Sequence, residues 1–244
     1  MKYRTIKNCG EVGIEFCNID TDGARVSRDF LRRLVNNIIR RSTAYHDETG
    51  EPVFFYKERQ FHSIVCPSIA DITPSYLMEH PLTRRPVREK EFTGHVDYWI
   101  GYRNYSFLME VKHCYFGYKR ADNPRQSIAE KFNSAMEQLK NIRKDECRYI
   151  TESARAKGLI KLAFLAIVFY EGSKDKITKD DMKRRDFKGL FRKLVENTEL
   201  NRSSNLRSLW VLHERLVEAF EYGGPSYEIY PAVAFVGNIS EMIW

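Results

Sequence analysis

The sequence predicts a three-layer α/β domain in which helices flank a mixed β-sheet. Apolar residues recur at helical spacing over residues 28–43 and again between residues 124 and 156. Between these segments, residues 94–113 form two apolar runs joined by a polar turn, which is typical of a β-hairpin. Residues 159–170 are nearly all apolar, as in a central strand buried on both faces. A helix that leads into such a strand indicates a crossover connection and parallel pairing.

The composition is that of a folded domain with a sizeable core. The chain has 244 residues, of which 43% are hydrophobic, and this excludes the disordered class. Its five cysteines are an odd number without a Cys-x-x-Cys pair, which argues against a disulfide framework and against a structural zinc site. We therefore expect one large domain.

The charge and the distribution of apolar residues indicate a partner and a cellular setting. The formal net charge of +7 favours a polyanionic partner such as nucleic acid. The N-terminus has no signal-peptide hydrophobic region, and no apolar run is as long as a membrane span. We expect a soluble, reducing, cytoplasmic setting without membrane contact.

The first part of the chain predicts a strand over residues 12–17 and then the helix at about 28–43, with Ser27 as its N-cap. A second helix is expected over residues 56–65, and it carries Glu58. Glu58 shares a helical face with apolar residues, which predicts that the Glu58 side chain points toward packed structure. The alternative is that Glu58 only favours the helix N-terminus through the helix dipole.

Two connections flank the hairpin. Residues 73–93 contain three prolines and a basic run over residues 84–90, and they are predicted to be a long loop. This loop either approaches a phosphate backbone or lies solvated on the surface. Residues 113–125 are a second loop with aromatic and basic residues, which leads into the helix at 124–156. Gln138 lies beside the apolar stripe of that helix, either on the surface or donating to a phosphate or a substrate edge.

The last part of the chain predicts two helices and a strand. The helices are expected over residues 187–197 and 205–221, and Gly223 with Gly224 ends the second. Residues 229–237 read as a late strand, and Pro231 predicts either that the strand lies toward a sheet edge or that the proline lies near the start of the strand.

Three charged residues interrupt the apolar runs of the hairpin: Asp97, Glu110 and Lys112. With Arg103 and Asn104 as a two-residue turn, Asp97 would lie directly opposite Glu110. Like charges at such a position are destabilising, so two facing carboxylates require a cation. A divalent metal with oxygen ligands suits them, and Lys112 adds a further positive charge. The alternative is an exposed hairpin face with a solvated or salt-bridged Glu-x-Lys pair.

These residues resemble the PD-(D/E)xK nuclease superfamily, the restriction-endonuclease-like enzymes. Asp97 and the run Glu110-Val111-Lys112 match its motif, with Val96 where the family's name has a proline. The resemblance covers about residues 56–171, in the order helix, hairpin, helix and strand. It implies a restriction-endonuclease-like core there, within a single domain that spans the whole chain and adds an N-terminal strand and helix and a C-terminal helix and strand.

The resemblance also implies the roles of individual residues. Asp97 and Glu110 would bind Mg²⁺, for which Mn²⁺ can substitute, and Lys112 would position or activate the attacking water. Glu58 matches a metal-linked Glu that the family often places on the preceding helix. Gln138 is similar to the Gln of a Gln-x-x-x-Tyr motif in the exonuclease and recombination branch, although this sequence has Ile142 in place of the Tyr.

The implied activity is metal-dependent hydrolysis of phosphodiester bonds, with DNA as the expected substrate. The alternative is a catalytically silent nuclease-fold module that binds nucleic acid or a partner protein. A third hypothesis is a structural protein in which Glu110 and Lys112 form only a surface salt bridge. The sequence leaves open whether the substrate is DNA or RNA and whether it is cut at its ends or internally. The oligomeric state is open as well, although cleavage of both strands would favour a homodimer.

Overall fold

The computed structural model describes residues 1–19, 21–84, 92–118, 126–173, 181, 185–196, 198, 200–217, 219–221 and 227–242. Its strands are β1 (Tyr3–Ile6), β2 (Gly10–Phe16), β3 (Tyr76–Arg84), β4 (Phe92–Tyr102), β5 (Tyr105–Gly117), β6 (Gly158–Ser173), β7 (Leu206–Leu212), β8 (Phe220–Glu221) and β9 (Tyr227–Met242). Its helices are α1 (Ala24–Thr49), α2 (Glu58–Ala70), α3 (Gln126–Lys140), α4 (Lys144–Ser153), α6 (Phe187–Glu196) and α7 (Leu200–Ser203), with single 3₁₀ turns at η1 (Val53–Phe55) and η3 (Glu214–Leu216).

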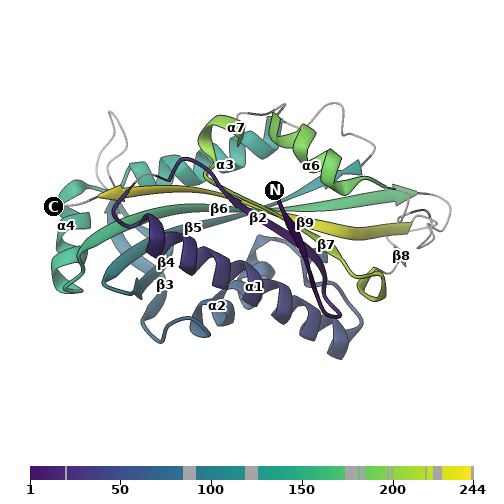
Figure 1. Cartoon of the computed structure of the whole chain (residues 1–244). Helices are drawn as coiled ribbons and strands as arrows, with labels where there is room; N and C mark the ends of the chain where they lie inside the picture. The colour runs from purple at the N-terminus through teal and green to yellow at the C-terminus, as the bar shows by residue number, and fades with distance from the viewer. Residues whose placement is uncertain are drawn as a thin grey trace.

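All of these strands belong to one nine-stranded sheet. Its order is β1-β2-β7-β9-β6-β5-β4-β3, and β8 pairs with β9. Strands β5 and β6 are parallel, and every other pairing between described strands is antiparallel. In Figure 1, helices α1 and α2 cover one face of the sheet, whereas α3, α6 and α7 cover the other. The predicted mixed α/β class is confirmed, with a largely antiparallel sheet.

The core lies on both faces of the central strands β5, β6 and β9. Strand β6 is buried from Gly158 to Phe169 because helices cover both of its faces. On one face, Phe30 of α1 packs on Phe107 of β5 with their ring centroids 4.8 Å apart. None of the helices in the described part of the chain has the length and apolar character that a membrane span needs.

Several predicted elements are confirmed with shifted ends. The first helix extends to Ala24–Thr49 and Gly23 takes the N-cap position, so the assignment of Ser27 as the cap is wrong. The second helix runs through Pro67 to Ala70. The predicted strand at 159–170 is β6, which pairs in parallel with β5 and antiparallel with β9. The long helix predicted for 124–156 is two helices, α3 and α4. The helix is interrupted at Ile142, whose backbone forms an isolated antiparallel β-bridge with that of Arg84.

Several further predictions of local structure are wrong. Residues 113–117, expected to begin the second loop, continue strand β5 to Gly117. Residues 76–84, expected in a loop, form the edge strand β3, where Pro81 is tolerated because it faces no further strand. Residues 206–212, expected in a helix, form strand β7. Strand β9, which carries Pro231, lies in the centre of the sheet, so the edge position is wrong, whereas the alternative that Pro231 lies near the start of its strand holds.

The position of Pro231 explains how a central strand accommodates a proline. The β7 ladder ends at Val211 and Ala232, so Pro231 lies just beyond it. On the other side, the register with β6 shifts between Phe169 and Glu171, and the proline falls at this irregularity. The missing N–H of the proline therefore interrupts neither ladder at a regular position.

Candidate functional site

The site begins with the hairpin of β4 and β5. These strands pair from Tyr102 and Tyr105 at the turn to Tyr98 and Met109. Arg103 and Asn104 both have positive φ, at 45° and 64°, as a two-residue hairpin turn requires. The predicted turn and register are therefore confirmed.

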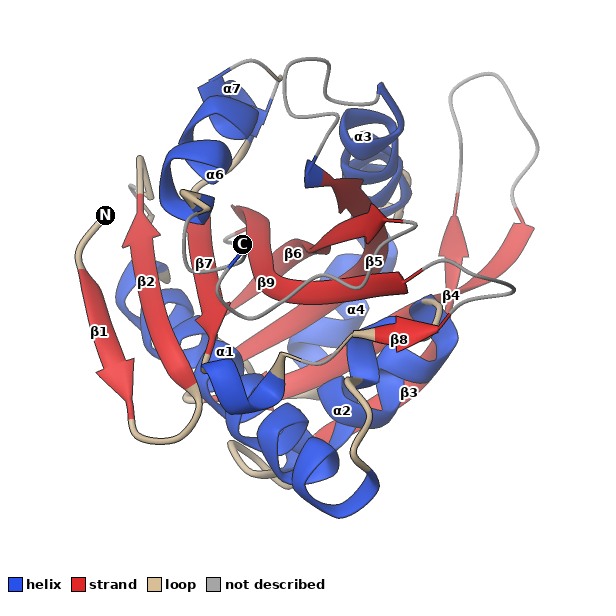
Figure 2. Cartoon of the chain, turned by 90° about the vertical axis from the view of Figure 1, so that its right-hand side faces the viewer, coloured by secondary structure: helices blue, strands red, loops and turns tan. Residues whose placement is uncertain are grey.

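Strands β4 and β5 separate at Asp97. Their ladder ends at Tyr98 and Met109, one position before the predicted pair of Asp97 and Glu110. In place of a backbone pair, Oδ2 of Asp97 accepts a hydrogen bond of 2.7 Å from the Val111 amide. Beyond this fork, β4 continues with β3 as a two-stranded ribbon, which Figure 2 shows beside the body of the sheet.

The pairing of β4 with its other neighbour is also interrupted at Asp97. The ladder with β3 passes from Met78–Tyr98 to His80–Val96 and omits the position between. Glu79 stands at that position with a φ of 47°, an uncommon conformation for a residue other than glycine. Strained backbone of this kind often marks functional sites, and here it lies directly beside the candidate ligand Asp97.

Glu110 is buried, with a relative exposure of 2%, and two cations contact it. Arg84 Nη2 donates to Oε1 in an ion pair, and Lys112 Nζ lies 3.7 Å from Oε2. Burial, together with the negative charge of Asp97, raises the pKa of Glu110 to about 7 even though both cations oppose this shift. The carboxyl thus lies close to a second carboxylate in a place that disfavours unpaired charge.

Lys112 connects Glu110 with Glu58. Its Nζ lies 3.8 Å from Oε1 of Glu58, while Oε2 of Glu58 accepts a 3.0 Å hydrogen bond from the His113 amide. Glu58 is the first residue of α2, but its contacts with two residues of β5 show that it does more than favour the helix N-terminus. Below it, His62 Nδ1 and the Tyr98 hydroxyl lie 2.7 Å apart and join α2 to β4.

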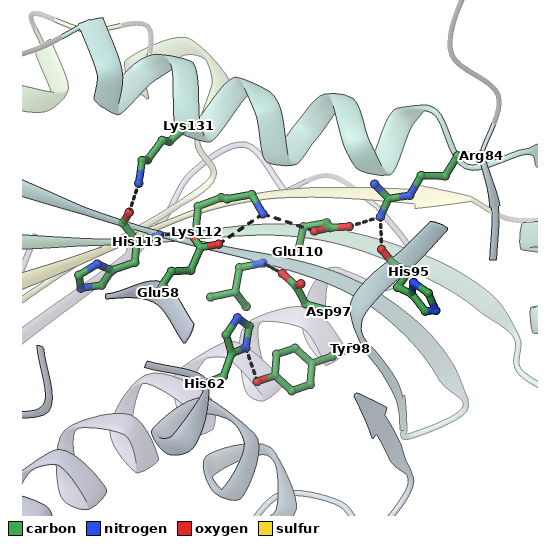
Figure 3. Close-up of polar contacts among 11 residues, drawn as sticks. Glu58, His62, Arg84, His95, Asp97, Tyr98, Glu110, Lys112, His113 and Lys131 are labelled. Atoms are coloured by element: carbon green, nitrogen blue, oxygen red, sulfur yellow. Dashed lines mark hydrogen bonds and ion pairs between the residues drawn. The ribbon is translucent and has the colours of Figure 1, made fainter. Parts of the chain in front are cut away.

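Figure 3 shows how these side chains converge. Arg84 and Lys112 approach Glu110 from opposite sides, and Asp97 lies below it toward α2. Lys131 of α3 donates to the His113 carbonyl at 2.6 Å and holds α3 against the end of β5. The structure thus gathers four of the five predicted site residues, Asp97, Glu110, Lys112 and Glu58.

Gln138 is not joined to these four by any hydrogen bond or ion pair within the described residues. It lies on α3, one turn before Ile142, whose backbone bridges to that of Arg84. Its Oε1 is buried and has no hydrogen-bond partner among the described residues. The Gln138 side chain is thus half-buried, with its carbonyl oxygen covered.

The donor set at the fork suits Mg²⁺ or Mn²⁺. Mg²⁺ is commonly held by one or two carboxylates and completes its shell with water and substrate phosphates. Asp97 and Glu110 supply two carboxylates, and burial together with the charge of Asp97 raises the pKa of Glu110, a shift that a divalent cation at this place would oppose. No cluster of three or more His, Cys, Asp or Glu side chains in a metal-binding arrangement occurs in the described part of the chain. Asp97 and Glu110 are thus the first candidate ligands, and the predicted third ligand, Glu58, lies beside them through Lys112.

Arg84 is the residue of the site that sequence reasoning missed. The sequence shows it only as the first residue of a basic run predicted to lie in a loop. Because residues 76–84 form a strand beside β4, its side chain reaches the fork. No regular alternation of apolar and polar residues marks 76–84 in the sequence, and Pro81 argues against a strand there. Residues 85–90 of the basic run and 119–125 of the second loop lie outside the described residues.

Comparison with known proteins adds no family assignment. Searches with protein-family models, against curated proteins and against solved structures find no match to this chain.

Proposed function

We propose that this chain is a metal-dependent nuclease of the PD-(D/E)xK type that hydrolyses phosphodiester bonds, with DNA as the expected substrate. The observation that carries the proposal is the convergence of Asp97, Glu110 and Lys112 where β4 and β5 separate. On this proposal, the hairpin, α2, α3 and β6 correspond to a restriction-endonuclease-like core. The net charge of +7 suits a polyanionic substrate.

Asp97 and Glu110 would hold the metal ion between the two separating strands. When bound, Mg²⁺ supplies charge stabilisation at the phosphoryl group and a water of lowered pKa. The hydrogen bond from the Val111 amide fixes the direction of the Asp97 carboxylate. Glu110 is fixed by burial and by its two cationic neighbours, so neither carboxylate needs to be ordered when substrate arrives.

Lys112 would supply positive charge and orientation at the reacting centre. In the hydrolysis, a water oxygen bonds to phosphorus while one ester P–O bond breaks, and negative charge grows on the phosphoryl oxygens. The Lys112 ammonium, held between Glu58 and Glu110, is placed to stabilise that charge and to orient the water. Glu58 is a positioning residue here, because it acts on the reaction through Lys112.

The test is cleavage of linear, circular and single-stranded DNA with Mg²⁺, Mn²⁺ or EDTA. We expect cleavage with either metal, none with EDTA, and a loss of at least about 100-fold in Lys112→Ala. Lys157→Ala is the matched control, because Lys157 is an exposed lysine that lies 3.9 Å from Asp22. Metal-dependent cleavage that survives unchanged in Lys112→Ala would show that the assigned site is wrong.

A catalytically silent nucleic-acid-binding module is the second candidate function. The observation in its favour is that Arg84 and Lys112 both pair with Glu110, so two cations of the protein itself balance this carboxylate. Thermal unfolding with and without Mn²⁺ separates the two functions. A metal site gains stability by mass action, and Asp97→Asn abolishes that gain. A silent module binds DNA but shows neither the gain nor cleavage.

A further inference from the structure

Arg84 enters the candidate site from the edge of the sheet. It is the last residue of β3, and its side chain has a relative exposure of 8%. The side chain runs over Gly94 of β4, where an added Cβ would lie 3.2 Å from Cδ of Arg84. Because Gly94 has no side chain, it leaves room for the Arg84 side chain to reach the fork.

The guanidinium is only partly used by its present partners. Nη2 donates both to Glu110 Oε1 and to the His95 carbonyl. Nε is buried and has no hydrogen-bond partner among the described residues. A guanidinium has five N–H donors in a rigid plane, so this buried group retains donor capacity beside the two carboxylates.

The charges around the fork change sign when a divalent cation enters. Asp97, Glu110 and Glu58 are three carboxylates, and Arg84 and Lys112 are two cations. With all five groups ionised they carry a single negative charge together, and a divalent cation turns this into a single positive charge. That charge matches a phosphodiester group. The same cation competes with Arg84 for the Glu110 carboxylate.

We propose that Arg84 is a phosphate-binding residue of this site. It holds Glu110 until a divalent cation takes the carboxylate, and its guanidinium then binds non-bridging oxygens of the substrate phosphodiester. The planar guanidinium of arginine can donate to two phosphate oxygens at once, which a lysine ammonium does not do in a fixed geometry. This assignment rests on the proposed nuclease function and names the residue that recognises its substrate phosphate.

The test combines Mn²⁺ titration of the DNA-free protein with steady-state cleavage of a labelled linear duplex. Arg84→Met removes the competing cation, so we expect the Kd for Mn²⁺ to fall on the order of tenfold. It also removes the phosphate contact, so KM for DNA should rise on the order of tenfold. Arg41→Met is the matched control, because Arg41 lies in an exposed ion pair with Asp71.

Arg84→Lys keeps the assignment testable if Arg84→Met does not fold. Arg84→Lys retains the positive charge but loses the planar guanidinium. The Kd for Mn²⁺ should therefore stay within about threefold of wild type, while KM for DNA rises. Wild-type values of KM in the folded Arg84 variants would overturn the assignment and leave the nuclease standing. A wild-type protein that neither binds Mn²⁺ nor cleaves DNA would overturn the proposed function itself, and the role of Arg84 with it.

Discussion

Glu110 is the residue at which a proton and a divalent cation would compete. Burial and the charge of Asp97 raise the pKa of its carboxyl to about 7. A metal ion binds only the ionised carboxylate, so the affinity for Mn²⁺ should fall as pH drops below 7, by up to about tenfold per pH unit. Calorimetric titration at pH 6 and pH 8 measures the difference.

The control for this pH dependence is Glu110→Gln. The amide does not titrate, so the residual Mn²⁺ affinity of the variant should be weaker and should change much less between the two pH values. Equal affinities of the wild-type protein at pH 6 and pH 8 would contradict the assignment of Glu110 as a metal ligand.

His113 links the site to stability in acid. Burial lowers the pKa of its imidazole to about 4, and the positive charge of Lys131 acts in the same direction. Between pH 4 and the unfolded value near 6.5, the unfolded chain binds a proton that the folded protein does not. The free energy of unfolding should therefore decrease as pH falls through this window, by up to about 3 kcal/mol from this residue.

Urea denaturation at pH 7 and pH 4.5 measures the contribution of His113. In His113→Gln, which has no titrating ring, the loss of stability between these two pH values should be smaller. If wild type and variant lose the same free energy of unfolding, then His113 does not carry the acid sensitivity.

The sequence predicted most of the site because its geometry is local. Asp97, Glu110 and Lys112 lie on one hairpin, and the turn at Arg103 and Asn104 fixes how its two strands pair. Arg84 reaches the site from a strand whose existence depends on pairing with β4, which no periodicity in its own sequence indicates. Residues placed by a turn are predictable in this chain, whereas residues placed by an edge pairing are not.

At the scale of elements, the hairpin turn should control the stability of the fork. Asn104 has a φ of 64°, which asparagine and glycine tolerate much better than alanine. Asn104→Ala should therefore lower the free energy of unfolding by about 1 kcal/mol, whereas Asn104→Gly should leave it near the wild-type value. Denaturant midpoints measure this comparison, and equal midpoints for the two variants would show that the turn carries no conformational strain.

The elements that were predicted wrongly share a physical cause. Strand β7 is buried on both faces at Leu209 and Trp210, so its apolar residues do not alternate and can be mistaken for a helical stripe. Pro231 suggested either an edge strand or the start of a strand, and in the central strand β9 it lies near the start, where both neighbouring ladders are interrupted. In each case the position in the sheet overrode the local pattern.

At the scale of the whole molecule, the last strand of the chain completes the centre of the sheet. Strand β9 lies between β6 and β7, so β6 has β5 on one side and the C-terminal strand on the other. Val233, Phe235 and Val236 of β9 are completely buried. The segment 56–171, which carries every predicted site residue, therefore depends on residues near the end of the chain.

A chain that ends before β9, at residue 226, should consequently not fold, although it keeps every site residue. Burial of each large apolar side chain contributes about 2 kcal/mol, so loss of the strand removes a sum comparable with the whole stability of a domain, about 5–15 kcal/mol. Strand β1 is the matched control, because it is an edge strand without a fully buried residue. Deletion of residues 2–7 should lower the melting temperature and leave a cooperative transition in circular dichroism. A cooperative transition with Mn²⁺-dependent stabilisation in the chain ending at 226 would instead show that the site segment is independent of β9.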